Sequence, residues 1–369
     1  MTSAAVPVES LDVAVYTVPT DAPEADGTLA WDYTTLVVAQ PVAGGQRGLG
    51  WSYTGAAAKT VIDDLLREIV VGRCALDVPG ILDAMVRQVR NLGRPGLVST
   101  AISAVDIALW DLKAKLLGLP LCSVLGRVRQ EVPVYGSGGF TTYDEGQTRR
   151  QLAHWVHDVG IPRVKIKIGE SWGSRPERDL ERIRLAREVI GPDTELFVDA
   201  NGGYTVGQAV RIADRFSAYD VHWFEEPVSS DDLGGLAEIR RQVHPDVAAG
   251  EYGYDLVYFA RMVDAGAVDC LQVDMTRCGG VTEFLRAAAV AAARNLQVSA
   301  HCAPNLHAHP ASCVPNLRHV EYFHDHVRIE EMLFSGALSP QGGVLVPDDG
   351  RPGLGLELRT GEAEPYRVA

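Results

Sequence analysis

The sequence lacks the features that mark disulfide-rich, secreted and membrane-spanning proteins. Its six cysteines are scattered over 369 residues without a CxxC pair or a framework spacing, which predicts reduced thiols and a cytoplasmic location. Residues 1–20 contain no basic segment followed by an apolar core, so no signal peptide is expected. The longest run of small apolar residues, Ala287–Ala293, is far too short to cross a bilayer.

Basic residues are too few to balance the acidic ones. The chain has 34 Lys and Arg against 48 Asp and Glu, a formal net charge of −14. This balance argues against a nucleic acid or an anionic membrane surface as partner, and we expect a small-molecule substrate instead. With 46% hydrophobic residues, the chain can bury the core of two domains or of one large α/β unit.

From about residue 130 onward, short β-rich segments alternate with amphipathic helical segments. In residues 177–190, for example, Leu180, Ile183 and Ala186 fall on one helical stripe before Gly191 and Pro192 end the helix. Such alternation predicts a parallel sheet covered by helices, either a (β/α)8 barrel or, as the competing layout, a doubly wound sheet. The predicted strands are Val132–Tyr135, Arg163–Ile168, Glu195–Val198, Val221–Phe224, Val247–Ala249, Cys270–Val273, Gln297–Ala300 and a weaker one at His319–Val320.

The N-terminal part of the chain has a different pattern. Two hairpin-like strands near Asp12–Val18 and Tyr33–Ala39 precede helices, and Val98–Leu117 has an apolar side at three- and four-residue steps. The sequence after about Ser339 is rich in Gly and Pro. We therefore expect an α+β domain over residues 1–128, a barrel over 129–338, and a C-terminal segment, 339–369, that returns to the first domain.

Three carboxylates end three consecutive predicted strands. They are Asp199 in LFVDANG, Glu225 in HWFEEP and Glu251 in AAGEYG, each 26 residues after the one before it. In a parallel barrel the C-terminal strand ends converge on one mouth, and three hard oxygen ligands there suit Mg²⁺. The alternative is that these acids only cap helices.

The segment RVKIKIGE, residues 163–170, places Lys165 and Lys167 on one face of a predicted strand. Because burying an unpaired ammonium is costly, this face is predicted to line the wet mouth of the barrel. We expect Lys165 to hold a substrate carboxylate. A nearby dication and the neighbouring lysine should lower the pKa of Lys167, which would then accept a proton.

Two further strand ends supply a second group for proton transfer. Asp274 in LQVDMTRCGG and His301 in VSAHCAPN are 27 residues apart, again one strand–helix unit, so their side chains can touch. A carboxylate on one imidazole nitrogen fixes the tautomer and makes the other nitrogen a better base. Glu321, at the eighth strand, is expected to be either a protonated hydrogen-bond donor or a rim acid.

Together these residues resemble the mandelate racemase subgroup of the enolase superfamily, the mandelate racemase/muconate lactonizing enzyme family. The resemblance implies a modified (β/α)8 TIM barrel with an N-terminal α+β capping domain. It also implies Mg²⁺ on Asp199, Glu225 and Glu251, and a homo-oligomer between dimer and octamer. The matching features are KIK at 165–167, DAN at 199–201, FEEP at 224–227, GE at 250–251, VD at 273–274, CGGVT at 278–282, His301 with Glu321, and AISAVDIALWDLKAKLLGLPL at 101–121.

Within the family, muconate-lactonising relatives place a lysine where this chain has Asp274, so Asp274 with His301 favours the racemase type. The resemblance implies abstraction of the proton α to a carboxylate through an enediolate. Asn201 resembles a polar contact to the substrate carboxylate or the metal shell, and it is equally suited to form a turn before Gly202 and Gly203.

Three functions remain open from the sequence. We favour a sugar-acid dehydratase, a lyase, because polar segments rich in histidine suggest a hydroxylated substrate; they contain His307, His309, His324 and His326. A racemase or epimerase of a 2-hydroxy acid or an amino-acid derivative, an isomerase, would use Lys167 and His301 on opposite faces. The most remote alternative is a non-catalytic barrel that binds a sugar acid.

Substrate specificity is expected in two loops of the N-terminal domain, at Ala22–Trp31 and Gly50–Gly55. Trp31, Trp51 and Tyr53 are the aromatic residues of these loops that could close the mouth over a substrate. The alternative is that each belongs to the core of the capping domain.

Overall fold

The apolar alternation near the N-terminus produces a long antiparallel hairpin. The computed structural model describes residues 6–369, and in it β1 (Ser10–Ala25) pairs with β2 (Ala30–Ala43), with Val15 opposite Val37. Both strands extend well beyond the predicted segments. The rest of this capping domain consists of β3 (Gln46–Arg47), β4 (Gly50–Tyr53), α1 (Ala57–Val61), a helical turn at Ile62–Leu66, α2 (Arg67–Val70), α3 (Val78–Gln88), α4 (Leu97–Leu117) and α5 (Leu121–Leu125).

All eight predicted barrel strands form, and the last is longer than expected. They are parallel neighbours in chain order, and β12 pairs with β5, which closes the barrel and excludes the doubly wound sheet. The strands are β5 (Val132–Gly138), β6 (Arg163–Lys167), β7 (Glu195–Asp199), β8 (Val221–Glu225), β9 (Asp246–Ala249), β10 (Cys270–Val273), β11 (Gln297–Ala300) and β12 (Leu317–Phe323).

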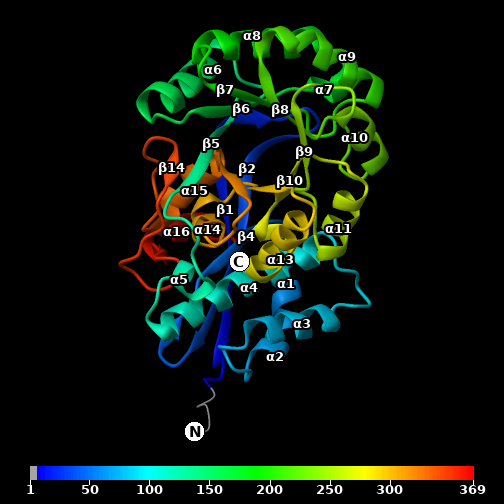
Figure 1. Ribbon diagram of the computed structural model, residues 1–369. Coiled ribbons are helices and arrows are strands. Elements are labelled where there is room, and N and C mark those ends of the chain that lie inside the picture. The colour runs from blue at the N-terminus through cyan, green and yellow to red at the C-terminus, as the bar shows by residue number, and fades with distance from the viewer. Residues whose placement is uncertain (1–5) are drawn as a thin grey trace.

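Helices lie around the outside of this barrel (Figure 1). They cover it because alternate strand residues such as Val164 and Ile166 join one apolar core with the helices. The elements between and after the strands are α6 (Glu145–Ala153), α7 (Glu170–Gly173), α8 (Pro176–Ile190), α9 (Val206–Phe216), α10 (Leu233–Arg240), α11 (Leu256–Asp264), α12 (Met275–Cys278), α13 (Gly280–Ala292), α14 (Pro304–Ala311) and α15 (His324–Leu333).

Helix α4 joins the capping domain to the barrel. Only one apolar side was expected, yet every residue from Ser99 to Leu112 is buried, because the helix lies between the cap sheet and α12 and α13. The approach is close enough that a Cβ on Gly50 would stand 2.4 Å from the Ala108 nitrogen. Asp106, buried in this helix, accepts hydrogen bonds from the nitrogen and hydroxyl of Thr282 in α13.

The ends of β1 and β2 form an arm, residues 19–31, that reaches across the barrel mouth. Its backbone is bonded to barrel loops: the Thr141 nitrogen donates to the Ala25 carbonyl (2.8 Å) and the Trp172 nitrogen to the Gly27 carbonyl (2.9 Å). A Cβ on Gly27 would meet the Ile168 carbonyl oxygen at 2.7 Å, so only glycine allows this contact. The arm thus covers the strand ends directly.

The C-terminal segment contacts both domains. Its strand β14 (Val344–Leu345) pairs with β5 of the barrel, and β15 (Glu357–Leu358) pairs with β13 (Phe334–Ser335). After α16 (Thr360–Ala363), the Val368 nitrogen donates to the Val15 carbonyl of the cap sheet. No helix in residues 6–369 is long and apolar enough to cross a membrane.

The segment Gly50–Tyr53 is the buried strand β4 and not a loop over the mouth. Trp51 is fully buried and stacks on Phe334 with ring centroids 4.1 Å apart, which places it in the core between cap and barrel. Tyr53 is half-buried at the same seam, where its hydroxyl donates to Glu330 Oε1 (3.1 Å) and its ring stacks on His326. Both side chains therefore lie where the core alternative put them.

We expect Trp51→Ala to lower the free energy of unfolding by about 3–5 kcal/mol, because the truncation leaves a cavity against Phe334. Urea unfolding followed by circular dichroism measures this loss. Trp51→Phe should recover part of it, and Trp172→Ala, at a side chain that is 68% exposed, should change stability by less than about 0.5 kcal/mol. An unchanged stability of Trp51→Ala with a raised KM would instead assign Trp51 to the substrate.

Candidate active site

The C-terminal ends of three neighbouring strands bring the three predicted acids together. Asp199 and Glu225 are the last residues of β7 and β8 and lie opposite each other in register, and Glu251 follows β9. One carboxylate oxygen from each lies within 4.8 Å of the others, and all three side chains are buried. The parallel barrel thus converts the 26-residue spacing into one compact cluster.

The donor set of this cluster fits a hard divalent cation. All three ligands are carboxylate oxygens, which suit Mg²⁺ better than they suit zinc. Glu251 Oε2 accepts no hydrogen bond from the protein, although His301 Nε2 stands 3.2 Å away. A buried carboxylate oxygen without a donor is costly unless a cation meets it.

The two lysines of β6 take different places around the acids. Lys167 Nζ lies 2.5 Å from Asp199 Oδ2. Lys165 donates to Glu225 and stands 2.8 Å from Glu321 Oε1. The Lys165 side chain is 1% exposed, so its ammonium serves these carboxylates, whereas a contact with a substrate carboxylate was expected.

The expected fall in the lysine pKa is not produced by the protein's own charges. Burial disfavours the charged form of Lys167, but Asp199, together with Glu251 and Glu321, more than offsets this and raises its pKa above the usual value. The same holds for Lys165, whose pKa is raised by Glu225 and Glu321 against the effect of burial. The expectation rested on a dication and the neighbouring lysine, and it did not include the carboxylates that pair with both lysines.

His301 and Asp274 form the predicted pair at the ends of β11 and β10. His301 Nδ1 lies 2.8 Å from Asp274 Oδ2, which directs Nε2 toward the acids. Burial alone would raise the pKa of Asp274, but the hydrogen bond from His301 and its charge lower it to about 2. The carboxylate therefore stays ionised and holds the orientation of the imidazole.

Arg277 was missed by the sequence analysis. Its guanidinium contacts Glu251 Oε1 (3.2 Å) and Asp274 Oδ2 (3.4 Å), so it links a carboxylate of the cluster to the His301 pair. Its sequence signal was a cation three residues after Asp274, in the short helix α12 that follows.

Glu321 is neither a protonated donor nor a rim acid. It is fully buried, accepts hydrogen bonds from Ser137 Oγ (2.6 Å) and the Cys302 nitrogen (3.1 Å), and pairs with Lys165. Burial favours its neutral form, but Lys165 and His301 outweigh it and hold the pKa well below the usual range. The eighth strand thus contributes a fixed negative charge beneath the mouth.

Aromatic side chains form the floor of the site inside the barrel. Trp223 Nε1 donates to Glu225 Oε2 (2.8 Å), which leaves Glu225 with a fixed orientation. Lys165 Nζ stands 5.4 Å from the centre of the Tyr135 ring, and Phe197 stacks on Trp223. The cluster of charges therefore rests on an apolar layer, where electrostatic interactions are strong.

The histidine-rich segments are not polar loops. His307 and His309 lie in α14 and are fully buried, with ring nitrogens that accept from the nitrogens of Met275 and Cys122. His324 and His326 begin α15; His326 Nδ1 accepts from the Ala303 nitrogen. Their link to a hydroxylated substrate is therefore wrong for three of the four, which serve as structural hydrogen-bond partners.

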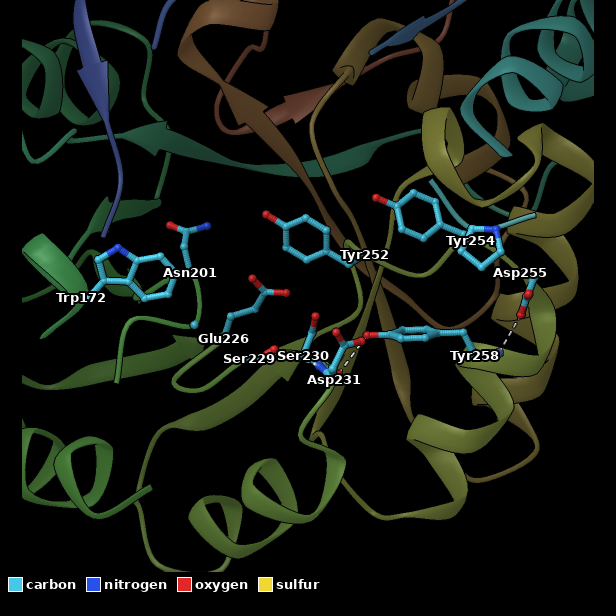
Figure 2. A pocket seen from close by; sticks show the side chains of 12 residues that line it. Trp172, Asn201, Glu226, Ser229, Ser230, Asp231, Tyr252, Tyr254, Asp255 and Tyr258 are labelled. Carbon is cyan, nitrogen blue, oxygen red and sulfur yellow. Dashed lines mark hydrogen bonds between the residues drawn. The ribbon is translucent and has the colours of Figure 1, made fainter. Parts of the chain in front are cut away.

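A cavity of about 510 Å³ opens beside the acid cluster, at the loops after β6, β7, β8 and β9 (Figure 2). Glu226, which follows Glu225, has φ +38° and a buried Oε1 without a donor. Asn201 forms a turn, with φ +45°, as one of its two predicted roles required, and its buried Oδ1 accepts no hydrogen bond. The lining residues are Pro95, Trp172, Asn201, Gly202, Glu226, Ser229, Ser230, Asp231, Tyr252, Tyr254, Asp255 and Tyr258.

Comparisons with known proteins cover nearly the whole chain. Residues 14–126 match the family model for the mandelate racemase/muconate lactonizing enzyme N-terminal domain, and residues 147–363 match the one described as enolase C-terminal domain-like. The chain is 33% identical to 3,6-anhydro-alpha-L-galactonate cycloisomerase of Streptomyces coelicolor, over 95% of this chain and 97% of the relative. It is 31% identical to L-rhamnonate dehydratase of Saccharopolyspora erythraea, over 88% and 83%.

Solved structures of the same fold superpose closely. A mandelate racemase/muconate lactonizing enzyme-like protein from Rubrobacter xylanophilus is 48% identical, with a TM-score of 0.95 and coverage of 98% of this chain and 100% of that one. A racemase from Streptomyces coelicolor with bound magnesium is 31% identical, with a TM-score of 0.92 and coverage of 98% and 100%. L-talarate/galactarate dehydratase from Salmonella typhimurium, with Mg and L-lyxarohydroxamate, is 27% identical, with a TM-score of 0.90 and coverage of 99% and 94%.

Proposed function

Because the chain belongs to the mandelate racemase/muconate lactonizing enzyme family, we propose that it is a Mg²⁺-dependent sugar-acid dehydratase that abstracts the proton α to the carboxylate. The observation that carries this proposal is the pair of proton-transfer groups on nearly opposite sides of one acid cluster. Lys167 ends β6 and His301 follows β11, and the strands that carry Asp199, Glu225 and Glu251 lie between them.

In the proposed reaction each group moves one proton. Lys167 takes the proton from C2 of the substrate once Asp199 no longer holds it charged, because a bound Mg²⁺ would balance that carboxylate, and an enediolate results. A C2–C3 double bond then forms as the C3–O bond breaks. His301 gives its Nε2 proton to the departing oxygen, while Asp274 holds the imidazole from Nδ1. The resulting enol tautomerises to a 2-keto-3-deoxy acid. Lys165 balances the charge of Glu225 and Glu321 throughout.

Asp199, Glu225 and Glu251 would hold Mg²⁺, which supplies positive charge to stabilise the enediolate that develops on the substrate. The arm, residues 19–31, excludes water from above, because its backbone is bonded to the loops around the mouth. The aromatic floor excludes water from below.

A ring-opening elimination is the second candidate. It is favoured by the similarity to the Streptomyces coelicolor cycloisomerase, which spans almost the full length of both chains. The same two groups serve this reaction if the oxygen on C3 is a ring ether and not a hydroxyl. The ether oxygen then stays attached to the product, so the product has the mass of the substrate, whereas a dehydratase product has lost water.

The cavity beside the cluster favours a substrate with one carboxylate. Glu226, Asp231 and Asp255 line it, and no Lys or Arg does in the described part of the chain. The rings of Trp172 and Tyr252 line the cavity, as Figure 2 shows. The apolar side of a sugar can pack on their faces. A second carboxylate at the far end of a diacid would meet like charge, which costs affinity.

We expect monoacid sugars to be turned over with kcat/KM at least about tenfold higher than diacid sugars of the same length. The experiment assays a panel of aldonates, 3,6-anhydro-aldonates and aldarates with Mg²⁺. The 2-keto product is detected as its semicarbazone, and its mass is determined by mass spectrometry. The double variant Asp231→Asn/Asp255→Asn should reduce the difference in kcat/KM between monoacid and diacid sugars. A preference for diacids would refute the monoacid proposal alone; absence of both keto product and α-proton exchange across the panel, with Mg²⁺ bound, would refute the reaction.

A further inference from the structure

A second group of metal-ligating side chains lies outside the acid cluster, where the arm meets the barrel. Asp21 and Glu24 belong to β1 of the capping domain, and His324 is the first residue of α15. One potential ligand atom from each lies within 4.8 Å of the others. His324 Nε2 stands 3.0 and 3.2 Å from the two carboxylate oxygens of Asp21.

Glu24 is the member of this group with a buried carboxylate oxygen that lacks a partner. Its side chain has no exposed surface, and its Oε2 accepts from Trp31 Nε1 at 2.8 Å. Its Oε1 is buried and has no hydrogen-bond partner among the described residues. An unpartnered buried carboxylate oxygen is expensive, and either a proton or a cation has to compensate for it.

The charges around Glu24 favour a cation. Arg328 does not compensate for Glu24, because it pairs with Asp325 Oδ1 (2.5 Å) and donates to the Pro19 carbonyl (2.6 Å). A dication bound here would meet the unpartnered Oε1 of Glu24 and balance the negative charge of Glu24 and Asp21.

We propose that Asp21, Glu24 and His324 form a second divalent-metal site at the seam between cap and barrel, and that it binds Zn²⁺. Two carboxylates with one imidazole are a mixed oxygen and nitrogen set, which a borderline ion such as Zn²⁺ prefers and Mg²⁺ does not. Three protein ligands leave the fourth position of a tetrahedral ion for water. The partly exposed Asp21 and His324 provide the entry path.

The place of this site gives it a positioning role. Glu24 precedes the Ala25 and Gly27 carbonyls through which the arm is bonded to the loops at the barrel mouth. A metal ion shared by β1 and α15 would hold the arm over the acid cluster without contacting the substrate. Its occupancy should therefore affect the stability of the closed arm more than the chemistry below it.

The test uses the full chain with the catalytic cluster disabled by Asp199→Asn and Glu251→Gln. Isothermal titration with ZnCl₂ should give one site per chain, and Glu24→Gln or His324→Ala should weaken it at least tenfold. His154→Ala is the matched control, because His154 also pairs with an aspartate, Asp158, at 3.0 Å, but on the exposed surface. It should leave Zn²⁺ binding unchanged.

A second measurement avoids the double variant, in case that protein does not fold. Wild type dialysed against Zn²⁺ should contain one equivalent more metal than Glu24→Gln, and Zn²⁺ should raise the melting temperature of wild type more than that of Glu24→Gln. Equal zinc contents in the two proteins would overturn the proposal. So would a Zn²⁺ affinity that neither Glu24→Gln nor His324→Ala changes, since Glu24 would then be a protonated structural acid.

Discussion

Lys167→Ala should stop exchange of the substrate's α-proton with D₂O and lower kcat by about 10³-fold. The expected loss in kcat is that of a missing general base, because the other lysine of the site, Lys165, is paired with Glu225 and Glu321 and cannot replace Lys167. His301→Asn should lose product formation by a similar factor and yet retain α-proton exchange, since it acts on the departing oxygen. The measurement is deuterium incorporation followed by NMR, alongside keto-acid formation.

The control is Lys59→Ala, which removes a lysine paired with Asp63 in the capping domain and should keep full activity. Asp274→Asn should resemble His301→Asn with a smaller loss, because the imidazole remains but its tautomer is no longer held. If instead each single variant stops exchange from one C2 epimer only, the enzyme is a racemase or epimerase. Full exchange by the double variant Lys167→Ala/His301→Asn would refute both assignments.

The second large effect is expected at the metal ligands. Asp199→Asn, Glu225→Gln and Glu251→Gln should each weaken Mg²⁺ binding by about 100-fold or more and abolish turnover, because each removes one charged oxygen of a buried set of three. Mg²⁺ titration by calorimetry and circular dichroism separates lost binding from lost folding. Treatment of wild type with EDTA should remove activity, and added Mg²⁺ should restore it.

Asp214→Asn provides the comparison, since it makes the same chemical change at an exposed position of α9 and should leave Mg²⁺ affinity unaltered. Full activity of EDTA-treated protein, free of metal by elemental analysis, would show that the three acids serve another purpose. The assignment would likewise fail if the three variants bound Mg²⁺ as tightly as wild type.

The elements and charges nearest the strand ends were predictable because a parallel barrel imposes a period on the chain. Asp199, Glu225 and Glu251 recur at one strand–helix unit, and His301 follows Asp274 at nearly the same interval, so the fold alone brings them to one mouth. The apolar residues of the strands supplied the second constraint, because they set which side chains face the interior.

Features that depend on packing between distant segments could not be predicted in this way. Trp51 and Tyr53 were predicted to lie in a loop, but they belong to β4, which pairs with β2 beneath α4. His307 and His309 were expected in polar loops, but a ring nitrogen of each accepts a hydrogen bond from a backbone nitrogen of another element. Glu226 has a backbone turn with positive φ and a buried Oε1 without a hydrogen-bond donor, and no pattern of residue types in the sequence predicts either feature.

The burial of α4 on all sides also limits how this protein could have diversified. Domains joined by a polar, hydrated interface can be exchanged between proteins as modules, but α4 shares one apolar core with both the cap sheet and the barrel. A foreign capping domain would have to reproduce contacts such as that of Gly50 with Ala108 to within a few tenths of an ångström. We therefore expect changes of substrate to arise through the loops around the mouth more readily than through exchange of whole domains.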